Sequence, residues 1–480
     1  MLFNSLAYAA FLPVVLAGYF VLPHRWRTVW LLAASCVFYM VYKPIYIVVL
    51  GGLITIDYTA GLCIERASRR WAKCFFWISI SATIAVLGIF KYSNFIAHNV
   101  GAVGGFFNLH TTLPTFRWAL PIGLSFHTFQ SMAYVIEVYR GNQRAERNPI
   151  VYATYVMFFP QLVAGPIERP GHLLQQFREI HRFDAARIAS GMKRIAFGLF
   201  KKAVIADRLA LFVNQIFANP ASFNGFYLAI ASVAFCYQIY CDFSGYTDIA
   251  IGSAEMLGFR LVENFDSPFA SRSISEFWRR WHMSLSNWFR DYVFIPLGGS
   301  RTTPLLTARN YMITFMLAGL WHGANWTFIV WGALNGGFLI AGRALKLYRD
   351  RLAEAFGLAP DHPVRVAFGI ATTFTLFCVG MIFFRSKDLS EAVYFVTHLY
   401  RNWYITPINV YAADFFQFKI AIAAILLLEL VQFIARKPKL TAYWDAFPTP
   451  ARWVPYMALG LGTILFGVYF AEGTFIYFQF

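Results

Sequence analysis

The chain has 480 residues, of which 58% are hydrophobic, 19% are aromatic and only 14% are charged. A soluble domain of this length could not bury so much apolar surface in one core, and its charged share would be roughly 25%. Lys and Arg total 41 against 24 Asp and Glu, a formal charge of +17. Because the basic residues lie in short stretches between apolar runs, the excess fits the positive-inside rule and not nucleic-acid binding. We therefore expect an integral membrane protein with no nucleic-acid partner.

Long apolar runs, which are candidate membrane segments, recur along the chain. In chain order they are 2–22, 28–42, 44–62, 74–96, 117–138, 150–165, 190–217, 224–241, 310–342, 366–384, 415–434 and 452–470. The 310–342 run allows one long tilted helix or two helices broken near Gly319 or Gly323. Since a span needs about 20 residues, we expect an all-α bundle of about 11–13 membrane segments, some of them interfacial or re-entrant.

No linker, low-complexity tract or repeat divides the chain, so we expect one polytopic domain, 1–480. The six cysteines are scattered without a CxxC pair or a Cys/His spacing typical of zinc sites. We expect neither a disulfide framework nor a bound metal.

Residues 242–301 interrupt the apolar pattern. Two carboxylates and three hydroxyls occur within 242–248, and 263–269 is rich in turn-forming residues. The next stretch, 275–292, has the period of one amphipathic helix with His282 beside its apolar stripe. The stripe consists of Trp278, Trp281, Leu285, Trp288 and Tyr292. An interfacial helix anchored by Trp and Arg explains this stretch without any chemistry.

His322 is the stronger candidate for a functional residue. Residues 310–342 contain no Asp, Glu, Lys or Arg, and His322 is their one titratable side chain apart from Tyr311. An ionisable group at membrane depth is costly and indicates a functional site by default. The alternative is a histidine that only hydrogen-bonds a neighbouring helix. We expect the active-site region to lie within 242–342.

Several motifs together resemble one family. Residues 278–282 (WRRWH) and 321–323 (WHG) place two histidines forty residues apart, as in the membrane-bound O-acyltransferase (MBOAT) family. Further likeness to the bacterial branch, and within it to the alginate O-acetyltransferase membrane subunit, lies at 121–126, 159–167, 242–248 and 475–480. The resemblance covers most of the chain and implies an MBOAT-like helical bundle in the bacterial inner membrane.

The resemblance implies that His322 is the catalytic histidine and His282 the second residue of the active site. It implies transfer of an acetyl group from a cytoplasmic thioester, acetyl-CoA, across the membrane to an extracytoplasmic polysaccharide such as alginate. A periplasmic SGNH-type partner is expected, and no bound cofactor. Because a hydroxyl is a poor nucleophile until a base takes its proton, His322 would act as the general base.

Other polar and aromatic side chains near the two histidines are candidates for substrate binding. Arg279 and Arg280 could pair with CoA phosphates, although interfacial anchoring accounts for them equally well. The remaining candidates are Ser284, Asn287, Asn325, Trp321 and Asp242.

Three alternatives stay open. A D-alanyl transferase of the teichoic-acid type would use the same motifs with another acyl group. A transporter or flippase of lipid-linked sugars would need polar residues spread along several spans, whereas here they cluster between 242 and 326. A structural subunit of a polysaccharide-export complex would leave His322 unexplained.

Overall fold

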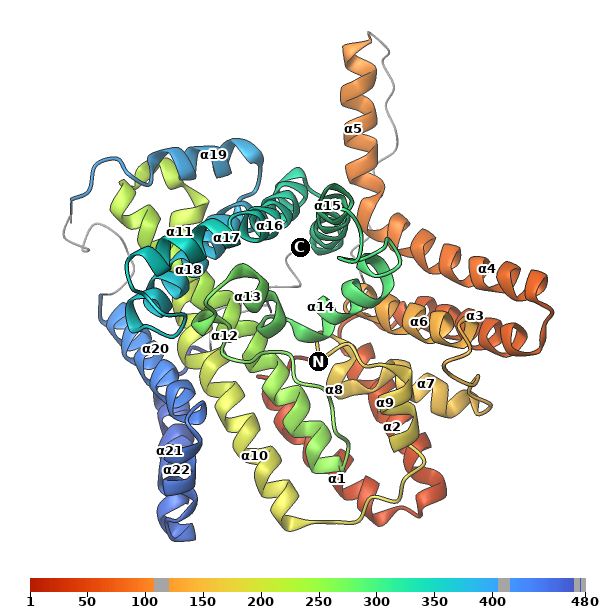
Figure 1. Cartoon of the computed structure of the whole chain (residues 1–480). Coiled ribbons are helices and arrows are strands. Elements are labelled where there is room, and N and C mark those ends of the chain that lie inside the picture. The colour runs from red at the N-terminus through yellow and green to blue at the C-terminus, as the bar shows by residue number, and fades with distance from the viewer. Residues whose placement is uncertain (108–120, 405–414, 470–474, 476–480) are drawn as a thin grey trace. The chain divides into compact units, whose positions relative to one another are not determined.

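The computed structural model describes residues 1–107, 121–404, 415–469 and 475, and every regular element among them is a helix (Figure 1). The expected all-α membrane class is confirmed. Of the C-terminal stretch 475–480 that resembles the alginate-type branch, only Phe475 lies within the described residues.

Five helical segments in the described part of the chain are long and apolar enough to cross a membrane. They are α3 (Tyr46–Arg66), the continuous run Arg69–Phe106, α12 (Gly225–Leu257), α18 (Pro363–Arg385) and residues Phe416–Ala435 of α20. A sixth is possible if α16 (Trp326–Ala344) and α17 (Lys346–Ala355), which are bent by 51°, form one span. The expected total of 11–13 also counts shorter helices such as α1 (Leu6–Val21), whose 16 residues rise only about 24 Å. The protein is a multi-pass membrane protein.

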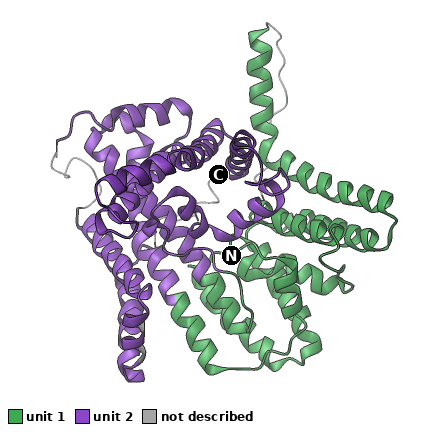
Figure 2. Cartoon of the chain, viewed as in Figure 1, with its two compact units in different colours: residues 1–195, 249–262 green, residues 196–248, 263–480 purple. Residues whose placement is uncertain are grey.

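The chain packs as two compact units (Figure 2). Unit 1 comprises Met1–Ile195 and Ile249–Val262, and unit 2 comprises Ala196–Asp248 and Glu263–Phe480. Helices α10 (Ala185–Leu199) and α12 contribute residues to both units. The expectation of a single domain stays a prediction.

Unit 1 is built on the N-terminal helices and the last turns of α12. Its Tyr8 hydroxyl lies 2.6 Å from the Ser253 hydroxyl of α12, and both groups are buried. Close packing of α10 on α12 requires glycine, because a Cβ on Gly252 would lie 2.6 Å from the Gly191 carbonyl oxygen. Besides α1, α3 and most of α10, the helices of this unit are α2 (His24–Met40), α4 (Arg69–Leu87), η1 (Gly88–Tyr92), α5 (Ser93–Phe106), α6 (Leu124–Tyr139), α7 (Pro149–Met157), α8 (Phe159–Leu162) and α9 (Pro170–Gln176).

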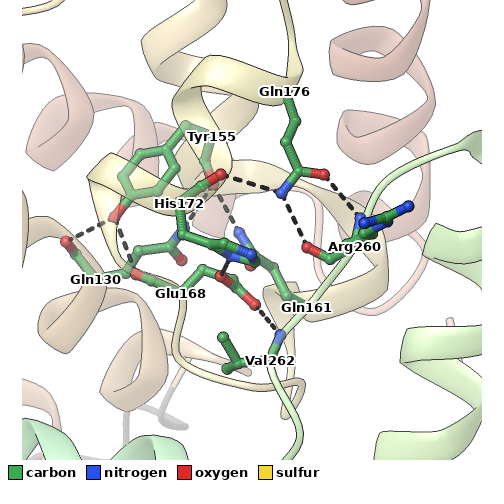
Figure 3. A network of polar contacts seen from close by, with 8 residues as sticks. All are labelled: Gln130, Tyr155, Gln161, Glu168, His172, Gln176, Arg260 and Val262. Atoms are coloured by element: carbon green, nitrogen blue, oxygen red, sulfur yellow. Dashed lines mark hydrogen bonds and ion pairs between the residues drawn. The ribbon is translucent and has the colours of Figure 1, made fainter. Parts of the chain in front are cut away.

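A buried carboxylate ties the chain after α12 to the start of α9 (Figure 3). Glu168, which is fully buried, accepts the backbone N–H of Val262 at 2.6 Å through one oxygen and lies 2.6 Å from His172 Nδ1 through the other. The hydrogen bond that His172 donates to Glu168 raises the pKa of His172, whose side chain is 41% exposed. One carboxylate thereby holds two segments that are about ninety residues apart in the sequence.

Gln176 extends this attachment by pairing with the backbone of Arg260 (Figure 3). Its side-chain oxygen accepts the Arg260 N–H at 2.7 Å, and its Nε2 donates to the Arg260 carbonyl at 2.9 Å. Residues 260 and 262 of this extended segment therefore form hydrogen bonds through their backbones, as alternate residues do in a strand pair. Here the partners are side chains, those of Gln176 and Glu168. These contacts fix the chain up to two residues before Asn264.

Unit 2 contains a large aromatic core and, besides the first turns of α12, the helices from residue 200 onward. These helices are η2 (Phe200–Ala206), α11 (Asp207–Ala218), η3 (Pro220–Ser222), η4 (Pro268–Ala270), α13 (Ile274–Arg280), α14 (Met283–Phe289), η5 (Arg290–Phe294), α15 (Pro304–His322), α16, α17, α18, α19 (Leu389–His398), α20 (Phe415–Ala435), α21 (Pro438–Asp445) and α22 (Thr449–Phe466). The 310–342 run thus forms two helices, and the break near Gly323 is confirmed.

Helices α15 and α16 pack at backbone contact distance. A Cβ on Gly319 would lie 2.2 Å from the Phe328 carbonyl oxygen, and one on Gly332 would lie 2.3 Å from the Phe315 carbonyl oxygen. Small residues allow such approach in membrane helices, where dispersion contacts drive association. This hairpin sets the position of His322, the last residue of α15.

Adding one methyl group should disturb this hairpin. We expect Gly319→Ala to lower the free energy of unfolding by about 1–3 kcal/mol, because the added Cβ overlaps backbone atoms that have no room to move. Gly337→Ala in α16 is the matched control, since no atom lies within 4 Å of its Cβ position. Thermal unfolding in detergent measures both. Equal midpoints for the two variants would contradict the close-packing account.

The Glu168–His172 contact predicts a pH-dependent stability. Because the folded-state pKa of His172 is raised above its ordinary 6.5, its contribution is full below that pH and is lost as the pH rises through the folded value. Wild type should exceed His172→Gln in thermal midpoint most at a pH of about 5.5 and least at about 8.5. A difference in thermal midpoint that stays constant with pH would show that protonation of His172 does not contribute to stability.

Candidate active site

His282 lies at a break between two short helices. The sequence predicted one helix over 275–292, and this is wrong: α13 ends at Arg280 and α14 begins at Met283. His282 has φ 42° and ψ 54°, a left-handed backbone that residues with a Cβ seldom adopt and that clusters at functional sites. Apolar periodicity misses such a break because the stripe resumes in phase after two residues.

The His282 imidazole is buried among aromatic rings and one amide. Its Nδ1 lies 3.1 Å from Asn264 Oδ1. The Phe243 ring meets the imidazole edge-on, with centroids 4.6 Å apart. Burial lowers the pKa of His282 to about 3, so the imidazole is neutral at physiological pH.

His322 is enclosed by a second set of aromatic rings at the end of α15. Its ring centroid lies 5.0 Å from that of Trp331 and 5.1 Å from that of Phe384, both in near-perpendicular orientation. The helix stops directly after it, and a Cβ on Gly323 would overlap the Phe328 ring. The imidazole is therefore held at a helix end with 7% of its surface exposed.

Trp321 brings the two predicted histidines together within unit 2. Its indole centroid lies 4.8 Å from that of His322 and 6.4 Å from that of His282, T-shaped in both cases. Residues forty positions apart in the sequence thus pack on one indole. The fold therefore brings the histidines of the WRRWH and WHG motifs close together, and their catalytic roles stay predictions.

Of the other predicted substrate-binding residues, some are bonded within the protein near the histidines and others are exposed or paired on the surface. Ser284 is buried beside Asn264 and bonds to it, and Asn325 caps α16 by accepting the Thr327 N–H at 3.1 Å. Asn325 also donates to a backbone carbonyl, that of Lys387, at 2.8 Å. Arg279 and Asn287 are exposed, and Arg280 forms an ion pair of 2.9 Å with Glu276.

Asp242 is part of a buried ionic cluster between α12 and the π-helical segment η2. Lys202 Nζ lies 2.6 Å from Asp242 and 2.8 Å from Asp207. The neighbouring Lys201 pairs with Asp248 at 2.5 Å and donates to Ser244 at 3.0 Å. Because Phe243 stands between two residues of this cluster, the ion pairs hold in place the ring that contacts His282.

Sequence reasoning missed Asn264, Lys201 and Lys202. The first lies in a stretch that was recognised only as turn-rich, and the two lysines lie in an apolar run. Adjacent lysines within the apolar run 190–217, with two aspartates in the 242–248 motif, were a usable signal for buried ion pairs. Among the residues that the structure describes, no three His, Cys, Asp or Glu side chains form a group that could hold a metal ion.

Comparison with known proteins identifies the family of the chain. The model of the membrane-bound O-acyltransferase family matches residues 141–382, a range that contains both histidines. The chain is 39% identical to the probable alginate O-acetylase AlgI of Pseudomonas putida over 94% of this chain and 90% of that protein. It is 40% identical to its counterpart in Azotobacter vinelandii, over 85% and 80%. It is 34% identical to the peptidoglycan O-acetyltransferase of Helicobacter pylori, over 82% and 78%.

Fold, motifs and comparisons therefore define a multi-pass membrane enzyme that transfers acyl groups to hydroxyls. The chain belongs to the membrane-bound O-acyltransferase family. The resemblance to the alginate-type members is likewise confirmed.

The ionic cluster yields a stability prediction. Lys202→Met should cost about 3–5 kcal/mol of unfolding free energy, because it leaves Asp242 and Asp207 buried without their cation. Lys346→Met on exposed α17 is the control and should change little. Thermal unfolding of both variants in the same detergent measures the difference. A Lys202→Met protein as stable as wild type would rule out the cluster as a structural anchor.

Proposed function

We propose that the protein is an O-acetyltransferase of the bacterial inner membrane. It takes an acetyl group from a cytoplasmic thioester, acetyl-CoA, and delivers it for O-acetylation of an extracytoplasmic polysaccharide such as alginate. Delivery is direct or through a periplasmic SGNH-type partner. The observation that carries this proposal is the packing of His282 and His322 on one indole within the family-matched region. The names of the relatives support acetate as the acyl group.

In this mechanism His322 is the general base. It takes the proton of the acceptor hydroxyl as the oxygen attacks the thioester carbonyl. The C–S bond then breaks, an ester forms, and the thiolate leaving group receives the proton from the imidazolium. A positioned base contributes about 10²–10⁴-fold to the rate. The rings of Trp331 and Phe384 around the imidazole favour transfer over hydrolysis, because they exclude water.

The remaining polar residues have supporting roles in the proposal. His282 orients the thioester or stabilises the developing oxyanion, and Ser284 and Asn325 give polar support nearby. Arg279 is the better placed of the two arginines for CoA phosphates, since it is exposed and Arg280 is already paired with an acid.

The test uses purified protein in nanodiscs with radiolabelled acetyl-CoA, a deacetylated polysaccharide and a periplasmic partner. We expect His322→Ala to lower the transfer rate by about 10²–10⁴-fold while the protein stays folded. His398→Ala is the matched control, because that histidine stacks on Tyr394 in α19, away from the site. Equal rates for wild type and His322→Ala would remove the catalytic role from that residue.

The same assay separates the alternatives. Loss of a D-alanyl thioester without loss of acetyl-CoA would indicate a D-alanyl transferase. If wild type consumes neither thioester with acceptor and partner present, the acetyl-transfer proposal fails. The protein would then be reconstituted into closed vesicles. Movement of a lipid-linked sugar across the vesicle membrane would support a transporter.

A further inference from the structure

Asn264 supplies hydrogen-bond acceptors to the whole start of α14. The residue is fully buried in the connection between α12 and η4. Its backbone carbonyl accepts the Met283 N–H at 2.9 Å. Its side-chain Oδ1 accepts the backbone N–H of Ser284 at 3.2 Å and the Ser284 hydroxyl at 2.9 Å. The same Oδ1 lies 3.1 Å from His282 Nδ1.

These contacts determine which atom of the amide faces the histidine. A backbone N–H can only donate, so the side-chain atom that faces Ser284 N is the oxygen and not the NH₂ group. An amide oxygen can only accept, so the His282 Nδ1 that lies against it must carry a proton. A neutral imidazole has one N–H, and its other nitrogen, Nε2, therefore bears the lone pair.

We propose that Asn264 is a positioning residue that fixes His282 in the Nδ1–H tautomer and so makes His282 Nε2 a hydrogen-bond acceptor in the active site. The backbone supports this assignment. His282 sits in the left-handed region, and the two residues that follow it donate to Asn264. Asn264 thereby holds the strained backbone and the ring by the same contacts.

The tautomer decides between the two roles offered for His282, and this step rests on the acyltransferase function proposed above. A neutral imidazole with its proton on Nδ1 cannot donate to an oxyanion through Nε2. It can accept a hydrogen bond from a substrate N–H or O–H. The chemistry that fits is an amide N–H of the thioester's carrier arm or a hydroxyl of the acyl acceptor. His282 therefore orients a substrate, and oxyanion stabilisation must come from other donors.

The first test reads the tautomer without any activity. The protein is labelled with ¹⁵N-histidine, and the His282 signals are identified as those missing from His282→Gln. We expect Nδ1 protonated and Nε2 unprotonated in wild type, and loss of this preference in Asn264→Ala. A wild-type signal with the proton on Nε2 would overturn the proposal. This result is independent of whether the protein transfers acetyl groups.

The second test is a pH titration of the His282 ¹⁵N signals in Asn264→Asp. The variant loses no hydrogen bond of the side chain, because Asn264 Nδ2 has no acceptor among the described residues. An anionic acceptor stabilises the imidazolium, so the midpoint of the His282 titration should move to higher pH by about one unit or more.

The matched control for this variant is Asn310→Asp. Asn310 is also fully buried, its Oδ1 accepts from the Arg309 guanidinium at 3.0 Å, and it lies three turns from His322 on α15. Asn310→Asp loses the donation from Nδ2 to the Gly299 carbonyl, so it also controls for general disturbance by a buried carboxylate. A carboxylate there should leave the midpoint of the His282 titration where it is in wild type. An unshifted midpoint in Asn264→Asp, or the same shift in Asn310→Asp, would overturn the positioning role. Absence of acetyl transfer by wild type would instead reject the proposed function and leave the tautomer to the NMR result.

Discussion

The Trp321 indole is the point on which the arrangement of unit 2 around the two histidines depends. It packs on the imidazoles of His282 and His322, and each of these lies where a helix is interrupted. A histidine at a helix interruption presents its ring without being covered by the following turn. The two interruptions have different causes: α15 stops before Gly323, whereas α14 is separated from α13 by residues that bond to Asn264.

Aromatic packing and buried ion pairs have different structural roles around the Trp321 indole. Rings enclose both imidazoles and keep the surroundings apolar, which strengthens every polar contact made inside. The ion pairs of Lys201 and Lys202 lie one step further out and fix α12 against η2. Phe243 belongs to the same turn of α12 as Asp242. These ion pairs therefore fix the position of the Phe243 ring, which contacts the His282 imidazole.

Much of the architecture could be predicted from the sequence, and the reasons for the misses are physical. The glycine positions predicted the break in 310–342 correctly. The charge-free run around His322 predicted a functional residue, and the structure shows that this residue is buried, while its role stays a prediction. The break at His282 could not be predicted from period, because its cause is a tertiary contact from Asn264. Similarly, the ion pair of Asp242 with Lys202 was not predicted, because the two residues lie forty positions apart and their contact is tertiary. The substrate contact expected for Asp242 stays a prediction.

The central claim is that acyl transfer takes place between His282 and His322 on the Trp321 indole. The most direct measurement is a structure of the protein with a non-hydrolysable acetyl-CoA analogue. The account predicts the carbonyl carbon beside Trp321, with His282 Nε2 and the His322 ring directed toward the acyl group or the acceptor oxygen at about 3–3.5 Å. An acyl group bound elsewhere, with both imidazoles out of reach and the activity retained, would contradict it.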